Sequence, residues 1–178
     1  AIVAMPLWPE EYVALRRLHL HLNTLGFVGL AAIGTLQVLM PTVAGRADTG
    51  VSDRLQRDLL PAVAGVVLIA AGAAWLAPLA WVGLALWLFP LLRLLDAWWR
   101  LYRSDVFAWH GPAPALAGAF AGMLILLAAG LLAPFFGTAM TNSAFGFIAA
   151  FLLPLVTGAA GALLPVLLRP GVQTSWHK

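Results

Sequence analysis

A long stretch without a charged residue, Leu22 to Met40, follows shortly after the pair Arg16 and Arg17. At a helical rise of about 1.5 Å per residue, its 19 residues cover about 28 Å, close to the thickness of the hydrocarbon core of a bilayer. The stretch therefore predicts a membrane-spanning helix.

Composition extends this prediction to the whole chain. Hydrophobic residues make up 62% of the 178 residues and charged residues 10%, with a mean hydropathy of +0.94, whereas charged residues alone form about a quarter of a typical soluble domain. Cysteine is absent, which excludes disulfides, iron–sulfur clusters and thiolate metal sites. The sequence predicts an all-α, polytopic integral membrane helix bundle that contacts the lipid bilayer and has no nucleic-acid partner.

Prolines and charged residues divide the chain into five expected spans within a single transmembrane domain, residues 1–178. We expect Pro41 to stop the first span, and a short surface helix capped by Ser52 or Asp53 to follow it. Pro90 is expected to kink the third span. The expected spans cover about residues 15–40, 59–77, 79–97, 115–136 and 144–168.

The cations are distributed unequally between the two sides of these spans. Arg16 and Arg17 lie on the side where the first span begins, and every other Lys and Arg falls on the opposite side. Cytoplasmic loops carry an excess of Lys and Arg. We therefore expect an integral protein of a bacterial inner membrane, with its N-terminus outside and its C-terminus in the cytoplasm.

Two histidines, His19 and His21, stand at the start of the first span. A histidine within a span is costly to leave unpaired, so it suggests a function. Residues two apart on a helix are turned by roughly 200°, so the two imidazoles leave on nearly opposite faces. They are candidate ligands for haem or a metal, or else interfacial side chains bonded to water and headgroups. His110 and His177 are expected to be surface histidines on the cytoplasmic side.

Polar and small residues recur along one face of the same helix at close to 3.6-residue spacing. This face is expected to meet protein, cofactor or water rather than lipid, and it lies with His19, which we expect to hold a cofactor. The alternative is hydrogen bonding between helices by Asn23 and Gln37. The stripe comprises Arg16, His19, Asn23, Gly34 and Gln37. The candidate cofactor-binding residues are therefore His19, His21 and Asn23, with His19 and His21 as the candidate metal ligands.

Signals elsewhere in the chain concern packing. Arg93 and Asp96, three residues apart, are expected to form a local ion pair. Glycine pairs at short spacing favour close approach of helices or leave room for a flat cofactor. They are Gly26 with Gly29, Gly118 with Gly122, and Gly158 with Gly161. Trp75, Trp81 and Trp87 are candidates to line such a pocket, although anchoring at the membrane interface is the expected role of Trp75 and Trp81.

The segment His19-x-His21-Leu22 followed by Gly26 resembles the His-x-His-Leu-x-x-x-Gly helix of the haem-copper oxidase superfamily's main subunit. The nitric oxide reductase and cbb3-type branches are the most similar. In that family the first histidine ligates the active-site haem and the second ligates the low-spin haem, so the resemblance implies these roles for His19 and His21. It is confined to residues 16–45, where Gly34, Pro41 and Gly45 also match the family's glycine, terminating proline and further glycine.

The rest of the chain lacks the family's intramembrane His-His pair and its helix with His-Pro-Glu. We therefore expect a haem- or metal-binding membrane protein that is a subunit or fragment of an electron-transfer complex, not catalytic alone, with other membrane subunits as partners. Haem is the expected cofactor, and copper or a chlorophyll-type pigment stays open. The alternative is a structural or pigment-contacting subunit that packs against a larger respiratory or photosynthetic complex.

Overall fold

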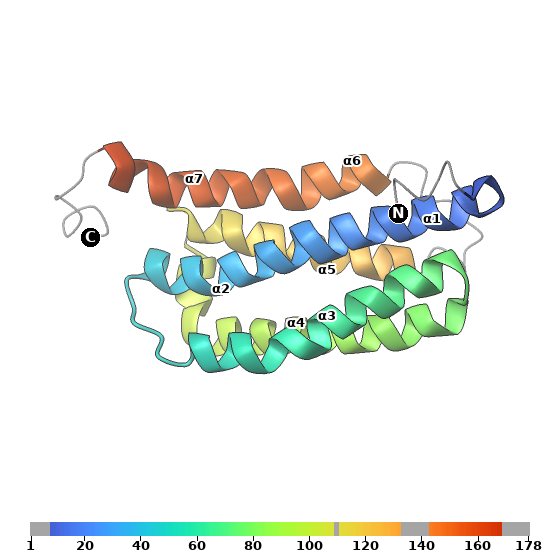
Figure 1. Ribbon diagram of the computed structural model, residues 1–178. Coiled ribbons are helices and arrows are strands. Elements are labelled where there is room, and N and C mark those ends of the chain that lie inside the picture. The colour runs from blue at the N-terminus through green and yellow to red at the C-terminus, as the bar shows by residue number, and fades with distance from the viewer. Residues whose placement is uncertain (1–7, 109–110, 133–142, 169–178) are drawn as a thin grey trace. The chain divides into compact units, whose positions relative to one another are not determined.

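The structure is a computed structural model that describes residues 8–108, 111–132 and 143–168 (Figure 1). Every regular element in these ranges is a helix. Five helices in them are long and apolar enough to cross a membrane: Pro9–Ala44, Val51–Ala74 (α3), Ala77–Val106 (α4), Ala113–Leu132 (α5) and Ala144–Leu168. This finding confirms the predicted all-α membrane helix bundle and places the chain in a bilayer.

The chain divides into two compact units. The first comprises Ala1–Val38 and Asp48–Leu101, and the second comprises Leu39–Ala47 and Tyr102–Lys178. The histidines of the sequence motif and the helices α3 and most of α4 belong to the first unit.

The first long helix, Pro9–Ala44, changes its winding along its length. A short 3₁₀ turn leads into α1 (Tyr12–His21), a π-helical segment covers Leu22–Leu30, and α2 (Ala31–Ala44) completes the helix. A π-helix pairs each N–H with the carbonyl five residues back instead of four. Asn23 Nδ2 and Thr24 Oγ1 donate to the carbonyls of His19 and Leu20, both at 2.8 Å. These side chains therefore add hydrogen bonds at the point where the backbone register changes.

The prediction that Pro41 ends the first long helix is wrong, because α2 continues through Pro41 to Ala44. Gly45 ends it with a φ of 63°, a conformation that costs a glycine little. The Gly45 N–H donates to the Thr42 carbonyl at 3.2 Å, and the Arg46 N–H donates to the Pro41 carbonyl at 3.1 Å. This pair of bonds is a Schellman motif, which satisfies carbonyls left open at the end of the helix.

The predicted surface helix after the first span is also wrong. The residues assigned to it form the first turns of α3, which runs unbroken from Val51 and has no side-chain cap at Gly50. Asp48 organises this helix start instead, since its Oδ1 accepts the Gly50 N–H at 3.0 Å and its carboxylate pairs with Arg54. The polar residues that follow Val51 and the second apolar span therefore form one continuous helix.

Within the first unit, α3 and α4 lie side by side and antiparallel, joined by a tight turn (Figure 1). Glycine allows their backbones to approach closely. A Cβ added at Gly65 would lie 2.8 Å from the Gly83 carbonyl oxygen and 2.8 Å from the Trp87 amide nitrogen. Of the glycines predicted to mediate packing, Gly26 faces Val66 and Gly29 faces the Trp87 ring.

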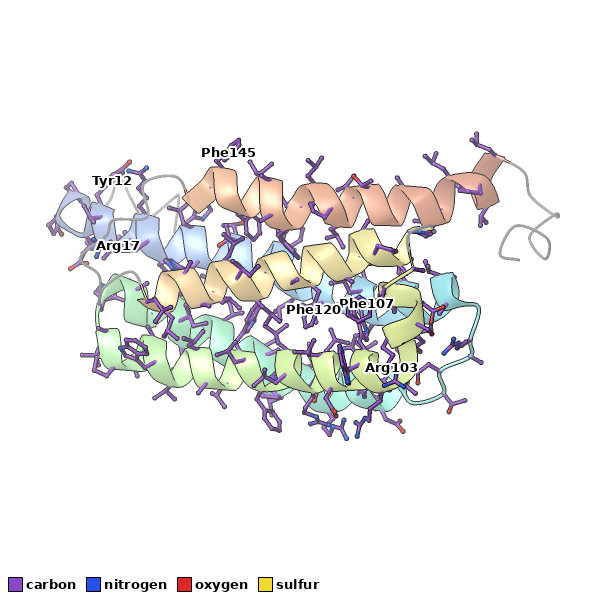
Figure 2. The ribbon with its side chains drawn as sticks, turned by 180° about the vertical axis from the view of Figure 1, so that it is seen from behind. Tyr12, Arg17, Arg103, Phe107, Phe120 and Phe145 are labelled. Carbon is purple, nitrogen blue, oxygen red and sulfur yellow. The ribbon has the colours of Figure 1, made fainter. Side chains whose placement is uncertain are left out.

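Within the second unit, α5 packs against the last helix, which comprises α6 (Ser143–Phe147), a π-helical segment (Ile148–Leu152) and α7 (Leu153–Leu168). A Cβ at Gly122 would overlap the Ala150 carbonyl, whereas one at Gly118 would meet nothing within 4 Å. Of that predicted pair, only Gly122 mediates close packing. Phe145 projects outward and is 74% exposed (Figure 2), as expected of a side chain in contact with lipid.

Candidate functional site

The two motif histidines lie in the last turn of α1, and both are partly exposed. His21 Nδ1 lies 2.8 Å from the Arg17 carbonyl oxygen. A carbonyl only accepts, so Nδ1 carries the proton and donates it. In a neutral imidazole the other nitrogen, Nε2, then holds a free lone pair. Histidines that bind metals commonly donate their second ring N–H to a backbone carbonyl in this way.

His19 has different hydrogen-bond partners. Asn23 Nδ2 lies 3.1 Å from His19 Nδ1, 3.3 Å from His19 Nε2 and 2.8 Å from the His19 carbonyl oxygen. If the amide donates to one ring nitrogen, the other nitrogen of a neutral ring carries the proton. In that arrangement neither ring nitrogen of His19 presents a free lone pair. Within the described residues the hydrogen bonds of Asn23 stay within its own helix, and its role between helices stays a prediction.

The structure therefore separates the two histidines, as their opposite directions on the helix suggest. The sequence pattern favours His19 as the cofactor ligand, whereas the hydrogen bonds favour His21 because only its ring presents a free lone pair. Among residues 8–108, 111–132 and 143–168, no three His, Cys, Asp or Glu side chains gather as in a metal site. His110 and His177 lie outside the described residues.

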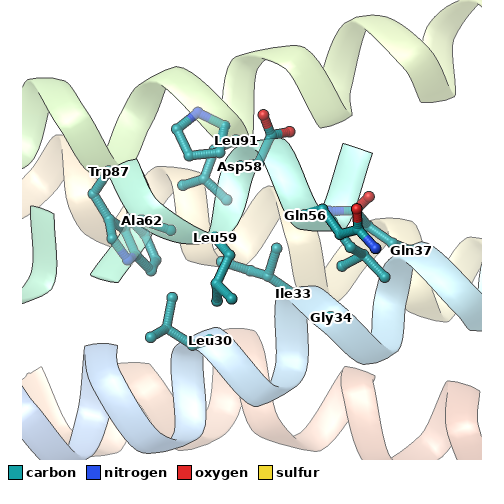
Figure 3. A pocket seen from close by; sticks show the side chains of 12 residues that line it. Leu30, Ile33, Gly34, Gln37, Gln56, Asp58, Leu59, Ala62, Trp87 and Leu91 are labelled. Carbon is teal, nitrogen blue, oxygen red and sulfur yellow. The ribbon is translucent and has the colours of Figure 1, made fainter. Parts of the chain in front are cut away.

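The two C-terminal residues of the polar stripe, Gly34 and Gln37, belong to a second candidate site. Gly34 and Gln37 line a cavity of about 290 Å³ between the first long helix, α3 and α4, all within the first unit (Figure 3). The other lining residues are mostly apolar: Leu30, Ile33, Leu55, Gln56, Asp58, Leu59, Ala62, Trp87, Pro90 and Leu91. The volume is at the small end of the range of ligand pockets, roughly 300–1,000 Å³. Trp87 is thus at a pocket, as the sequence suggests.

Three polar side chains of this cavity are buried: Gln37 is 3% exposed, Asp58 5% and Trp87 1%. One atom of each, Gln37 Oε1, Asp58 Oδ1 and Trp87 Nε1, has no hydrogen-bond partner. Roughly nine in ten buried polar groups in proteins have one. The cavity therefore has an apolar wall, and the three unpaired atoms lie behind it with almost no accessible surface of their own.

Asp58 is nevertheless compensated in charge. Its Oδ1 lies 2.9 Å from Arg93 Nη1 and 3.6 Å from Arg57 Nε. The approach of Arg93 is close enough for an ion pair, but its direction does not make a hydrogen bond to Oδ1. The two arginines therefore neutralise the charge of the Asp58 carboxylate but donate no hydrogen bond to its Oδ1.

The predicted ion pair between Arg93 and Asp96 is wrong. Arg93 crosses to Asp58 on α3 and also covers the Phe89 ring at 5.3 Å, while Asp96 pairs with Arg100 one turn further along α4. A buried carboxylate gains more from a cation than an exposed one does. Asp58 is not among the residues predicted from the sequence, although a charge at the edge of an apolar span is a signal that a partner is needed.

Comparison with known protein families, with curated proteins and with solved structures finds no match to this chain. The similarity to the haem-copper oxidase helix therefore stays a prediction that rests on the motif residues themselves.

Proposed function

We propose that this chain is a haem- or metal-binding subunit of a membrane electron-transfer complex, in which His21 is a ligand. The bond from His21 Nδ1 to the Arg17 carbonyl carries the proposal, because it leaves Nε2 free to bind a metal. A bound haem would supply one-electron redox chemistry. Other membrane subunits would complete the site, and the chain would not be catalytic alone.

The role of α1 in this proposal is to hold the imidazole in one tautomer and orientation. The Arg17 carbonyl lies one turn before His21, so the bond forms within a single rigid helix. His19 leaves the same helix on a different face, and it would serve a second cofactor once Asn23 releases its ring. Haem is the favoured cofactor because of the motif, with copper as the alternative metal.

We test this proposal by replacing His21, His19 and Asn23 singly by Ala in the full chain, expressed in its native membrane. The His21→Ala protein should lose the sharp haem absorption band, or the bound metal, measured per mole of purified protein. The Asn23→Ala protein should retain it, since this change frees His19 and leaves the Arg17–His21 bond intact. Equal cofactor content in the wild-type and His21→Ala proteins would refute the assignment.

The second candidate is a structural or pigment-contacting subunit of a larger respiratory or photosynthetic complex. Large apolar side chains along the last helix favour it, because Leu153, Val156 and Leu167 are more than half exposed. Such a protein would show no haem band after purification. A chlorophyll-type band would support a pigment role.

We also propose that the protein lies in a bacterial inner membrane with its N-terminus outside and its C-terminus in the cytoplasm, on the strength of its Lys and Arg distribution. A tag after Lys178 should resist a membrane-impermeant reagent in sealed cells and react once the cells are opened. Reaction in sealed cells would reverse the orientation.

A further inference from the structure

We propose that Arg57 and Arg93 together bind the phosphate of an anionic phospholipid at the edge of the bilayer. The two arginines are on α3 and α4, and both belong to the first unit. Their site shares no residue with the histidine site, and it needs neither a metal nor a partner chain.

The two arginines mark the end of the apolar part of each helix. No charged residue follows Asp58 in α3, and none precedes Arg93 in α4. Because these apolar segments cross the hydrocarbon core, the first charged side chains next to them reach the level of the headgroups. Arg57 and Arg93 are therefore at the depth of the lipid phosphates.

Asp58 brings the two guanidinium groups together. Its Oδ1 lies 2.9 Å from Arg93 Nη1 and 3.6 Å from Arg57 Nε, so two cations share one carboxylate and leave one positive charge in excess. Neither guanidinium donates a hydrogen bond to Oδ1, and both side chains are partly exposed. A guanidinium has several N–H donors and binds phosphate oxygens in pairs. Excess positive charge and available donors therefore favour an anionic phosphate.

Exposed apolar side chains lie one turn deeper in the membrane than each arginine. Leu60 is three residues after Arg57, and Phe89 is four residues before Arg93, so each shares a helix side with its arginine. Both are more than half exposed, and the Arg93 guanidinium lies 5.3 Å from the centre of the Phe89 ring. An acyl chain can contact these side chains while its phosphate meets the arginines, which a free phosphate ion cannot do. Basic sites between membrane helices bind anionic headgroups in this way.

The experiment titrates the full chain in detergent with phosphatidylglycerol or with phosphatidylcholine of the same acyl chains, and native mass spectrometry gives the dissociation constant of the first bound lipid. Both lipids carry a phosphate, but only phosphatidylglycerol has a net negative charge. We expect it to bind more tightly by about three- to tenfold, the effect of one arginine at a membrane surface. Arg57→Gln should remove most of this preference, and Arg57→Lys should keep part of it because the positive charge remains.

Arg103→Gln is the matched control, because it removes the same charge from an exposed position ten residues, or about 15 Å, further along α4. It should leave the preference unchanged, and a loss equal to that of Arg57→Gln would overturn the proposal. Equal dissociation constants of the two lipids for the wild-type protein would overturn it without any variant. An excess of glycerol 3-phosphate, which has no acyl chain, should not displace phosphatidylglycerol. Full displacement would indicate a site for free phosphates and overturn the lipid assignment.

Discussion

Removing Arg93 and removing Asp58 from their ion pair should lower the stability of the protein by different amounts. Asp58 is 5% exposed, whereas the Arg93 side chain is 27% exposed. Replacing Arg93 by Met leaves a buried carboxylate whose remaining cation, Arg57, is 3.6 Å away and 56% exposed. Breaking a buried pair costs about 3–5 kcal/mol, and we expect about 3 kcal/mol here because Arg57 compensates in part.

The reverse change should cost less. Asp58→Asn leaves the cation on Arg93, whose long side chain can turn its charged end toward water, so we expect a loss of about 1 kcal/mol. The double variant should be more stable than Arg93→Met alone, since the uncompensated carboxylate is then gone.

The assay is reversible unfolding of the purified chain by SDS in mixed micelles, followed by helical circular dichroism, which gives the free energy of unfolding. Arg100→Met is the matched control, because its pair with Asp96 is exposed on both sides, at 69% and 57%. We expect it to change the free energy by about 0.5 kcal/mol or less. Equal losses for Arg93→Met and Arg100→Met, or additive losses in the double variant, would refute the reasoning.

Two further predictions use the same unfolding assay. Gly65→Ala should lower the free energy of unfolding by about 1–3 kcal/mol, because the new methyl group meets backbone atoms of α4. Its control, Gly118→Ala, should leave the free energy of unfolding unchanged or raise it by up to about 1 kcal/mol. The same effect at both sites would contradict close packing of α3 and α4. Gly45→Ala should cost about 1 kcal/mol, because φ is positive there, and no loss would contradict the Schellman end of the first long helix.

The number of spans could be predicted from the sequence because the bilayer fixes the length of an apolar helix. The ends could not, because they depend on local hydrogen bonds. Pro41 lacks one backbone donor but does not force the chain out of the helix, and the bonds made by Gly45 and Arg46 determine where α2 ends. Likewise, the Asp48 side chain lets α3 begin at Val51, eight residues before the expected second span.

The candidate sites were predictable in part for a similar reason. The motif identifies the two histidines, but the partner of each ring depends on a side-chain rotamer that no spacing encodes. The ion pair of Arg93 was mispredicted because its true partner, Asp58, is 35 positions earlier in the chain and meets it only when α3 and α4 pack. Local spacing can identify only partners on the same helix, and the partner that Asp96 finds there is Arg100, which was not predicted.

The π-helical segment also separates the histidines from the cavity. His19 and Gln37 are 18 residues apart, which is five full turns of an α-helix, so regular periodicity places them on one face. Each residue that a π-helix adds turns the C-terminal remainder of the helix by about 100°, and Leu22–Leu30 lies between the two residues. The histidines and the cavity are then held by separately oriented parts of one helix. Gly34→Leu should therefore leave cofactor absorption per mole of purified protein unchanged. Loss of the absorption band in a folded Gly34→Leu protein would mean that the histidines and the cavity share one face after all.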